Sequence, residues 1–259
     1  MDVRALTFTG SVPTARAIQE AAAKSNLKNL VLELGGKAPV VIFEDADLNR
    51  AVPETARSVQ WNSGQTCMAN SRVYVQRSIS SKFIAAFEER FADVVLGDPT
   101  DPKTTHGPLA DSVQAERVRE FVAEGKESGK LVLGGEFEPG TFTIRPTIFT
   151  DTKEDAAIMK KEVFGPVVNI NVFDTEEEVL EKANATEYGL YAAVYTQDVS
   201  RALRFALGLE SGMVGVNCTS PQTAVDVPFG GYKMSGVGRE GFQHSLDNYL
   251  EKKSVLIRM

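Results

Sequence analysis

Residues 30–37 read Leu30-Val-Leu-Glu-Leu-Gly-Gly-Lys37, a short apolar run that carries a single carboxylate, Glu33, and ends in two glycines and a lysine. Four apolar side chains in five positions predict a buried strand. A carboxylate in such a strand costs several kcal/mol unless it is paired or protonated. An ion pair with Lys37 is one explanation. The other is catalytic, because burial raises a carboxyl pKa toward neutrality and suits the group to act as a general base.

Segments with the period of strands and of helices alternate on both sides of this run. We expect strands over 3–8, 30–34, 71–76, 130–133, 142–149, 167–173, 191–196 and 212–218, and helices over 11–24, 47–62, 80–95, 112–128, 175–185 and 199–209. This alternation predicts an α/β fold with right-handed crossovers. Residues 254–258 read as one more apolar strand with no later strand to pair with, and such a strand usually adds to another sheet, in the same chain or in a partner subunit.

Composition excludes several classes of function. The chain has 259 residues and a net charge of −7, which argues against nucleic acid or an anionic membrane as the main partner. Its two cysteines and two histidines lie far apart without metal-ligand spacing, so we expect no metal site. The first residues contain no long apolar run, so we expect neither a signal peptide nor a transmembrane helix, and the expected location is the cytoplasm.

One of the two cysteines lies in a loop that suits a nucleophile. The segment Asn62-Ser-Gly-Gln-Thr-Cys67-Met-Ala-Asn-Ser-Arg72 is polar and rich in small residues, and it joins a predicted helix to a predicted strand. Cysteine is the best side-chain nucleophile near neutral pH, since a few per cent is thiolate even when unperturbed. The alternative is that Cys67 is a small buried hydrophobic residue. Its polar neighbours weigh against that alternative.

A third segment, Phe8-Thr-Gly10-Ser11, joins a predicted strand to the start of a predicted helix. Free backbone N–H groups and the helix dipole favour an anion at such a position, so it is a candidate phosphate cradle. Ser11 is equally explained as a helix N-cap. Two further segments, 162–166 and 228–236, indicate turns when they are taken alone.

Together and in this order, five segments resemble the aldehyde dehydrogenase superfamily. They are Phe8-Thr-Gly-Ser11, Leu32-Glu-Leu-Gly-Gly-Lys37, Gly64-Gln-Thr-Cys67, Glu162-Val-Phe-Gly-Pro166 and Pro228-Phe-Gly-Gly-Tyr-Lys233. The resemblance implies an α/β fold with an aldehyde-dehydrogenase-type catalytic domain over 37–235. It also implies a remnant of a Rossmann-like cofactor domain over 1–36, and a C-terminal helix and oligomerisation strand over 236–259.

The resemblance assigns roles to the candidate residues. Cys67 would attack an aldehyde to give a thiohemiacetal, a hydride would leave to NAD or NADP, and Glu33 would activate the water that hydrolyses the resulting thioester. The implied partners are a small-molecule aldehyde and further copies of the chain in a homo-oligomer. The implied cofactor-binding residues are Gly10, Ser11, Gly35, Glu162 and Phe164.

Members of that superfamily are roughly twice as long, so the chain is expected to be N-terminally truncated. A dinucleotide fold needs two βαβ halves, and residues 3–34 supply one strand–helix–strand unit. Ala15 stands where the family often has a second glycine, and its methyl group is expected to hinder a phosphate. Two alternatives therefore stay open: non-redox covalent catalysis by Cys67, as in an esterase, a thioesterase or a condensing or cyclising enzyme, and a non-catalytic partner of full-length relatives.

Overall fold

A computed structural model describes residues 2–222 and 226–259 and confirms the predicted α/β fold. Its main sheet is parallel except for the antiparallel edge strand β5. From one edge to the other, the strands are β10 (Met213–Val216), β9 (Tyr191–Tyr195), β3 (Pro39–Ile42), β4 (Arg72–Gln76), β7 (Val167–Phe173), β6 (Thr147–Thr150) and β5 (Lys130–Leu133).

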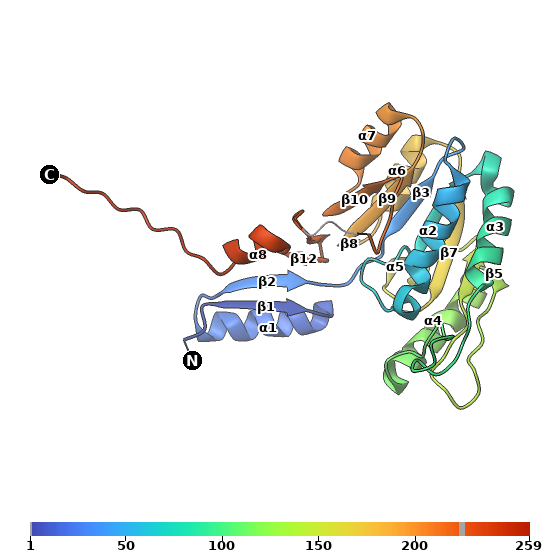
Figure 1. Ribbon diagram of the computed structural model, residues 1–259, viewed down its shortest axis with the longest axis horizontal. Helices are drawn as coiled ribbons and strands as arrows, with labels where there is room; N and C mark the ends of the chain where they lie inside the picture. The colour runs from blue at the N-terminus through green and yellow to red at the C-terminus, as the bar shows by residue number, and fades with distance from the viewer. Residues whose placement is uncertain (1, 223–225) are drawn as a thin grey trace.

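Helices cover both faces of this sheet (Figure 1). They are α2 (Leu48–Gln60), α3 (Ser80–Ala92), α4 (Ser112–Ser128), the short α5 (Ala157–Lys160), α6 (Glu176–Asn184) and α7 (Val199–Gly208). The alternating side chains of β3 separate the two faces. Val40 and Ile42 pack in the core cluster beneath α2 and α3, whereas Val41 and Phe43 pack in the cluster beneath α6 and α7. The period-2 geometry of a strand thus places one apolar layer on each side.

Strand β3 lies in the interior of the sheet and was not among the predicted strands. It pairs with β4 on one side and with β9 on the other. A proline normally argues against a central strand because it cannot donate to the ladder. Pro39, however, is the first residue of β3, where a missing N–H is tolerated, and the three apolar residues after it are fully buried.

A second, smaller sheet precedes the main sheet in the chain. Strands β1 (Ala5–Thr9) and β2 (Asn29–Glu33) are parallel and are joined by α1 (Val12–Ser25). The two-residue strand β12 (Gly236–Val237) returns from the far end of the sequence to pair with β2. The expected domain boundary after residue 36 falls between β2 of the small sheet and β3 of the main sheet, which are consecutive in the sequence. The division into domains itself stays a prediction.

The C-terminal residues leave the body of the protein. After the short helix α8 (Phe242–Asp247), the last residues run as an extended and exposed tail away from both sheets (Figure 1). Within the described part of this single chain, the strand predicted over 254–258 is not assigned as a strand. A terminal strand needs a neighbouring edge, so the pairing of this segment stays a prediction. Among the described residues no helix is both long and apolar enough to cross a membrane, and no group of three metal-ligating side chains occurs.

Candidate active site

A left-handed turn places Cys67 at the amino end of β4. Helix α2 ends at Gln60, and a 3₁₀ turn follows over Trp61–Gly64, in which Asn62 and Ser63 have φ values of 51° and 54°. Gly64 also has a positive φ, 73°, and a Cβ there would collide with the backbone at Gly165. The turn reverses the chain within a few residues, so the thiol lies against the segment that follows β2.

That close approach explains one of the glycines after β2. A Cβ on Gly36 would collide with the carbonyl oxygen of Cys67, so only glycine lets these two backbones pass. On the other side, the hydroxyl of the fully buried Ser235 donates to the carbonyl of Gly35 over 2.6 Å. The segment between the two sheets is therefore held from both sides beside the thiol.

Cys67 opens onto a cavity of about 450 Å³. Every residue that the sequence assigned to the cofactor lines this cavity: Gly10, Ser11, Gly35, Glu162 and Phe164. Glu33 is not among its lining residues. The fold thus gathers the thiol and these five residues around one space, although they come from segments up to about 150 positions apart in the sequence.

The carboxylate of Glu162 is hydrogen-bonded to the segment that follows β2. Its Oε1 accepts a hydrogen bond of 2.9 Å from the backbone N–H of Gly36, and a Cβ on Gly35 would lie 2.5 Å from Oε2. Burial raises the pKa of Glu162, and the hydrogen bond from Gly36 opposes that rise. The second carboxylate oxygen is left to face the cavity side of Gly35.

Two residues of α4 hold the Glu162 segment and were missed from the sequence. The amide of Gln114 donates to the carbonyls of Val163 and Phe164 over 3.0 and 2.8 Å, and the guanidinium of Arg117 donates to the carbonyl of Glu162 over 2.9 Å. Both side chains also line the cavity. Their spacing of three puts them on one face of α4, which is the only sequence signal that could have indicated them.

Glu33 is the last residue of β2, and its side chain is 4% exposed. The expected ion pair with Lys37 is absent: among the described residues neither Glu33 carboxylate oxygen has a hydrogen-bond partner, nor does the ammonium nitrogen of Lys37. Successive strand residues point to opposite faces, but Gly35 and Gly36 turn the chain before Lys37, so spacing alone did not decide the contact. A Cβ on Gly230 would lie 3.0 Å from Glu33 Oε1, so the carboxyl faces that loop.

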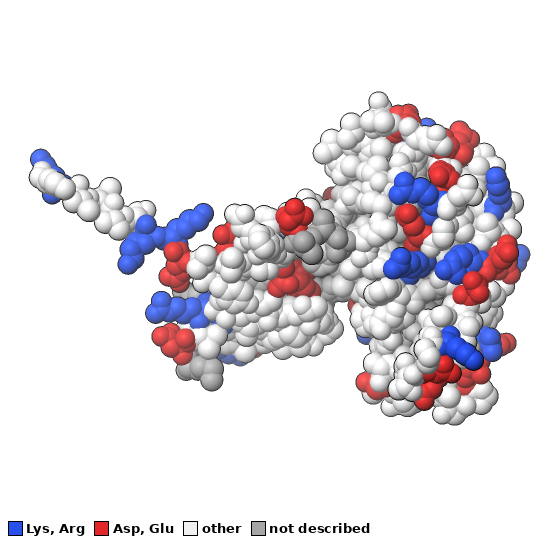
Figure 2. Space-filling model, viewed as in Figure 1, with Lys and Arg blue, Asp and Glu red and all other residues white. Residues whose placement is uncertain are grey.

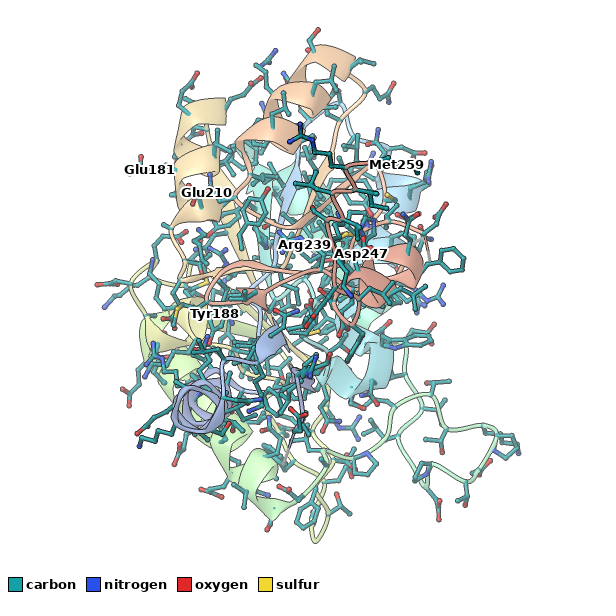
Figure 3. The ribbon with its side chains drawn as sticks, turned by 90° about the vertical axis from the view of Figure 1, so that its left-hand side faces the viewer. Glu181, Tyr188, Glu210, Arg239, Asp247 and Met259 are labelled. Carbon is teal, nitrogen blue, oxygen red and sulfur yellow. The ribbon has the colours of Figure 1, made fainter. Side chains whose placement is uncertain are left out.

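Burial is the main cause that raises the pKa of Glu33 to about 8, and the charge of Glu240 adds to the rise. The charge of Arg239, which is labelled in Figure 3, opposes the rise, and its guanidinium donates to the carbonyls of Gly238 and Gly231. Glu33 is therefore protonated at neutral pH. A carboxyl in this state becomes a base only as the pH approaches 8.

The thiol itself is less ionised than a free cysteine. Burial, and after it the charges of Glu162 and Glu33, raise the pKa of Cys67 to about 11. The few per cent of thiolate expected for an unperturbed cysteine is thus not available here. Nucleophilic attack by Cys67 needs a base that removes its proton during the reaction.

Gly10 and Ser11 lie where β1 passes into α1. The N–H of Gly10 donates to the carbonyl of Glu33 over 3.0 Å, and Ser11 is the N-cap residue, although its hydroxyl pairs with Thr14 and not with the helix backbone. The free N–H groups of the first turn of α1 therefore remain available to an anion. Ala15 does not obstruct them: its side chain is buried in the small core against β2 and does not line the cavity.

The fold and this cavity define an α/β protein with a half-buried cysteine whose pKa is raised by two nearby carboxyl groups. The model of the aldehyde dehydrogenase family matches residues 1–255. An aldehyde dehydrogenase of Agaricus bisporus is 44% identical over all of this chain, and an aldehyde dehydrogenase [NAD(P)+] 2 of Saccharomyces cerevisiae is 44% identical over 98% of it. The chain belongs to the aldehyde dehydrogenase family.

Solved structures agree with this assignment. An indole-3-acetaldehyde dehydrogenase mutant of P. syringae, in complex with NAD+ and IAA, has a TM-score of 0.96 and 39% identity over the whole chain. A gamma-glutamyl-gamma-aminobutyraldehyde dehydrogenase of Burkholderia cenocepacia has the same TM-score and 42% identity over 99% of it. The chain spans 52% of the length of the two curated relatives and 53% of the two solved chains.

Proposed function

We propose that this chain carries out the cysteine chemistry of an aldehyde dehydrogenase, with Cys67 as the nucleophile. Its sulfur attacks the aldehyde carbon to give a thiohemiacetal, loss of a hydride gives a thioester, and hydrolysis releases the carboxylic acid. The observation that carries the proposal is the single cavity that joins Cys67 to Gly10, Ser11, Glu162 and Phe164.

Glu33 is the base that this chemistry requires. Its pKa of about 8 lies closer to the pH of reaction than that of an ordinary carboxyl, and its charge is close enough to raise the pKa of Cys67. Proton transfer is most efficient when the pKa of the base lies near the working pH. Glu33 takes the proton of the water that attacks the thioester, and for this its carboxyl must turn from the Gly230 loop toward the cavity.

NAD or NADP is the hydride acceptor, as in the relatives that are named for it or were solved with it. The cavity fits one part of such a cofactor. Glu162 presents a carboxylate oxygen beside the side-chain-free Gly35, an arrangement suited to ribose hydroxyls, and Phe164 offers an aromatic face. Gly10 has no side chain to obstruct a pyrophosphate, and the first turn of α1 after Ser11 offers free N–H groups to it.

The chain alone is expected to bind the dinucleotide weakly. A dinucleotide crevice uses two βαβ halves, and the described part of the small sheet has two parallel strands joined by one helix. This observation favours a second candidate function without hydride transfer. An ester or thioester acylates Cys67, its alcohol or thiol leaves, and water hydrolyses the acyl-enzyme. The two candidates share Cys67 and Glu33 and differ in their need for the cofactor.

Calorimetry with NAD+ and NADP+, run beside assays of NADH formation and of p-nitrophenyl acetate hydrolysis, separates the two candidates. Micromolar cofactor binding with steady oxidation of a panel of aldehydes supports the redox function. Ester hydrolysis without cofactor binding supports the second function. Cys67→Ser is expected to abolish either activity, and Cys218→Ser, the matched control, to leave it intact. Activity that survives Cys67→Ser contradicts both.

The pH dependence of ester hydrolysis also tests whether Glu33 is the base. Because the base must be ionised, hydrolysis is expected to rise about tenfold per pH unit below the Glu33 pKa of about 8 and to level off above it. Glu33→Gln removes this rise and leaves a slow, flatter profile. A wild-type profile that already levels off near pH 5 is incompatible with Glu33 as the base.

A homo-oligomer is the proposed assembly. The extended tail exposes apolar side chains, with Leu256 99% and Ile257 80% exposed, and an unpaired apolar segment tends to add to the sheet edge of a neighbouring copy. Light scattering is expected to give at least twice the chain mass of 28.2 kDa. A mass of one chain throughout the micromolar range contradicts it, and deletion of 254–259 should shift an oligomer toward that mass.

A further inference from the structure

The main sheet has a second ligand-binding position that the thiol chemistry does not use. Cys67 precedes β4, so the thiol cavity lies at the amino ends of the strands. In open α/β sheets, ligands usually bind at the carboxyl ends, in the crevice where the order of strands reverses. Here that reversal lies between β3 and β9, because the chain passes from β3 to β4 on one side and from β9 to β10 on the other. Helices α2 and α7, which follow these two strands, cover opposite faces.

A cavity of about 920 Å³ begins at this reversal. The turn after β3, Tyr195 and Gln197 at the end of β9, and Asn217 just after β10 form its inner end. It continues outward between α2 and α3. Its volume is in the range of small-molecule sites, about 300 to 1,000 Å³.

The walls of this crevice are cationic in a chain whose net charge is −7. Arg50 on α2 and Lys82 and Arg90 on α3 line it, and Figure 2 shows Lys and Arg side chains gathered over these two helices on the face turned to the viewer. The only acidic residue that lines it, Asp47, accepts a hydrogen bond of 3.0 Å from the N–H of Asn49 as the N-cap of α2.

The three cations are only weakly neutralised. Arg50 lies 3.6 Å from Glu54, whose carboxylate also accepts a bond of 2.7 Å from Tyr195. Arg90 lies 3.4 Å from a largely exposed Asp93. Lys82 has no ion pair within the described ranges of the chain. Because these ion pairs are long or exposed, the two arginines and the lysine retain N–H donors for an anion. The planar guanidinium of arginine can donate to two phosphate oxygens at once.

We propose that this crevice binds a small organic phosphate with two phosphoryl groups, at a site separate from the thiol cavity. The strand reversal supplies the position, the volume exceeds that of an inorganic ion, and three cations match the charge of a diphosphate. The crevice begins after the carboxyl ends of β3 and β9, whereas Cys67 precedes the amino end of β4, so the ligand of the crevice does not meet the aldehyde.

The test is calorimetry on the full chain with inorganic pyrophosphate, and with citrate as a carboxylate probe, at low and at moderate ionic strength. Pyrophosphate is expected to bind in the micromolar to low millimolar range, more tightly than citrate, and to weaken as salt screens the charges. The double variant Arg50→Gln/Lys82→Gln is expected to lose about tenfold in affinity, the sum of two partly exposed charge interactions.

Two controls keep the outcome specific. Lys126→Gln/Lys130→Gln removes the same charge from exposed positions that do not line the crevice and should change the affinity less than twofold. Arg117→Gln, in the thiol cavity, should also leave it unchanged. Equal losses in both double variants would mean that only net charge matters, and a larger loss with Arg117→Gln would place the anion in the thiol cavity. Either result, tighter citrate binding, or no binding at low salt overturns the proposal.

Discussion

The two sheets differ in how far each buries its own strands. In the main sheet, all four residues of β3 are fully buried, and three apolar clusters pack the helices on both faces. In the small sheet, only part of β2 is buried, β1 has no fully buried residue, and the core cluster has three buried members. Parallel sheets are normally covered on both faces. The main sheet is therefore stabilised by its own helices, whereas the stability of the small sheet depends on further segments that cover its exposed strands.

The largest effect is expected in the main core. Phe83, Phe87 and Phe91 form a stacked column on α3, with ring centroids 5.7 and 5.2 Å apart and no exposure. Phe87→Ala removes the middle ring and should lower the free energy of unfolding by about 3–5 kcal/mol. Urea unfolding followed by circular dichroism measures it. A loss below about 1 kcal/mol in the free energy of unfolding would show that neighbouring side chains fill the space left by the Phe87 ring. This core would then be less rigid than its burial indicates.

The matching change in the small sheet is Leu32→Ala. Leu32 is 1% exposed but has few buried neighbours, so we expect a loss near the lower limit for such substitutions, about 2 kcal/mol. The loss should also be local. Hydrogen exchange should rise in β1, α1 and β2 while the amides of β3 and β4 keep their protection. Uniformly faster exchange in both sheets would show that they unfold as one unit.

Glu33 should make stability fall as the pH rises. Its pKa is about 8 in the folded chain against 4.5 for a free glutamate, so between these values the folded state holds a proton that the unfolded state has lost. Its stabilising contribution is complete below pH 4.5 and is lost as the pH rises through 8, by at most about 1.4 kcal/mol per unit. Urea titrations at pH 6, 7 and 8 should show this decline, and Glu33→Gln should flatten it. A parallel decline in the variant would assign it to other groups.

Lys37 should make stability rise as the pH rises, opposite to Glu33, and its effect near neutral pH should be smaller. Burial is the largest cause that lowers its pKa from 10.5 to about 7, and Arg72 adds to it. The unfolded chain therefore binds a proton that the folded chain lacks, so this contribution is present above pH 10.5 and is lost as the pH falls through 7. Lys37→Met should raise stability by about 1 kcal/mol at pH 7. Destabilisation at that pH would mean that the ammonium has a partner after all.

The candidate site was largely predictable because its residues lie in short, ordered segments. Cys67 and Glu33 were candidates from local sequence and Glu162 from the family resemblance, and Cys67 and Glu162 line one cavity. Gln114 and Arg117 were not found, because a polar pair on a helix does not show which backbone it will meet. The contact between Glu162 and Gly36 spans 126 positions, a distance over which periodicity carries no information.

The sequence by itself determined the alternation of strands and helices and the family, and it singled out Cys67 as the candidate nucleophile, because these depend on side-chain period and on residues next to one another. Only the tertiary structure decided that Pro39–Ile42 is an interior strand of the sheet, and that Glu33 and Lys37 are both buried without hydrogen-bond partners among the described residues. It also decided that three cations of α2 and α3 face one crevice. Strand order, burial and charge environment arise when distant segments pack together, and local pattern does not encode that packing.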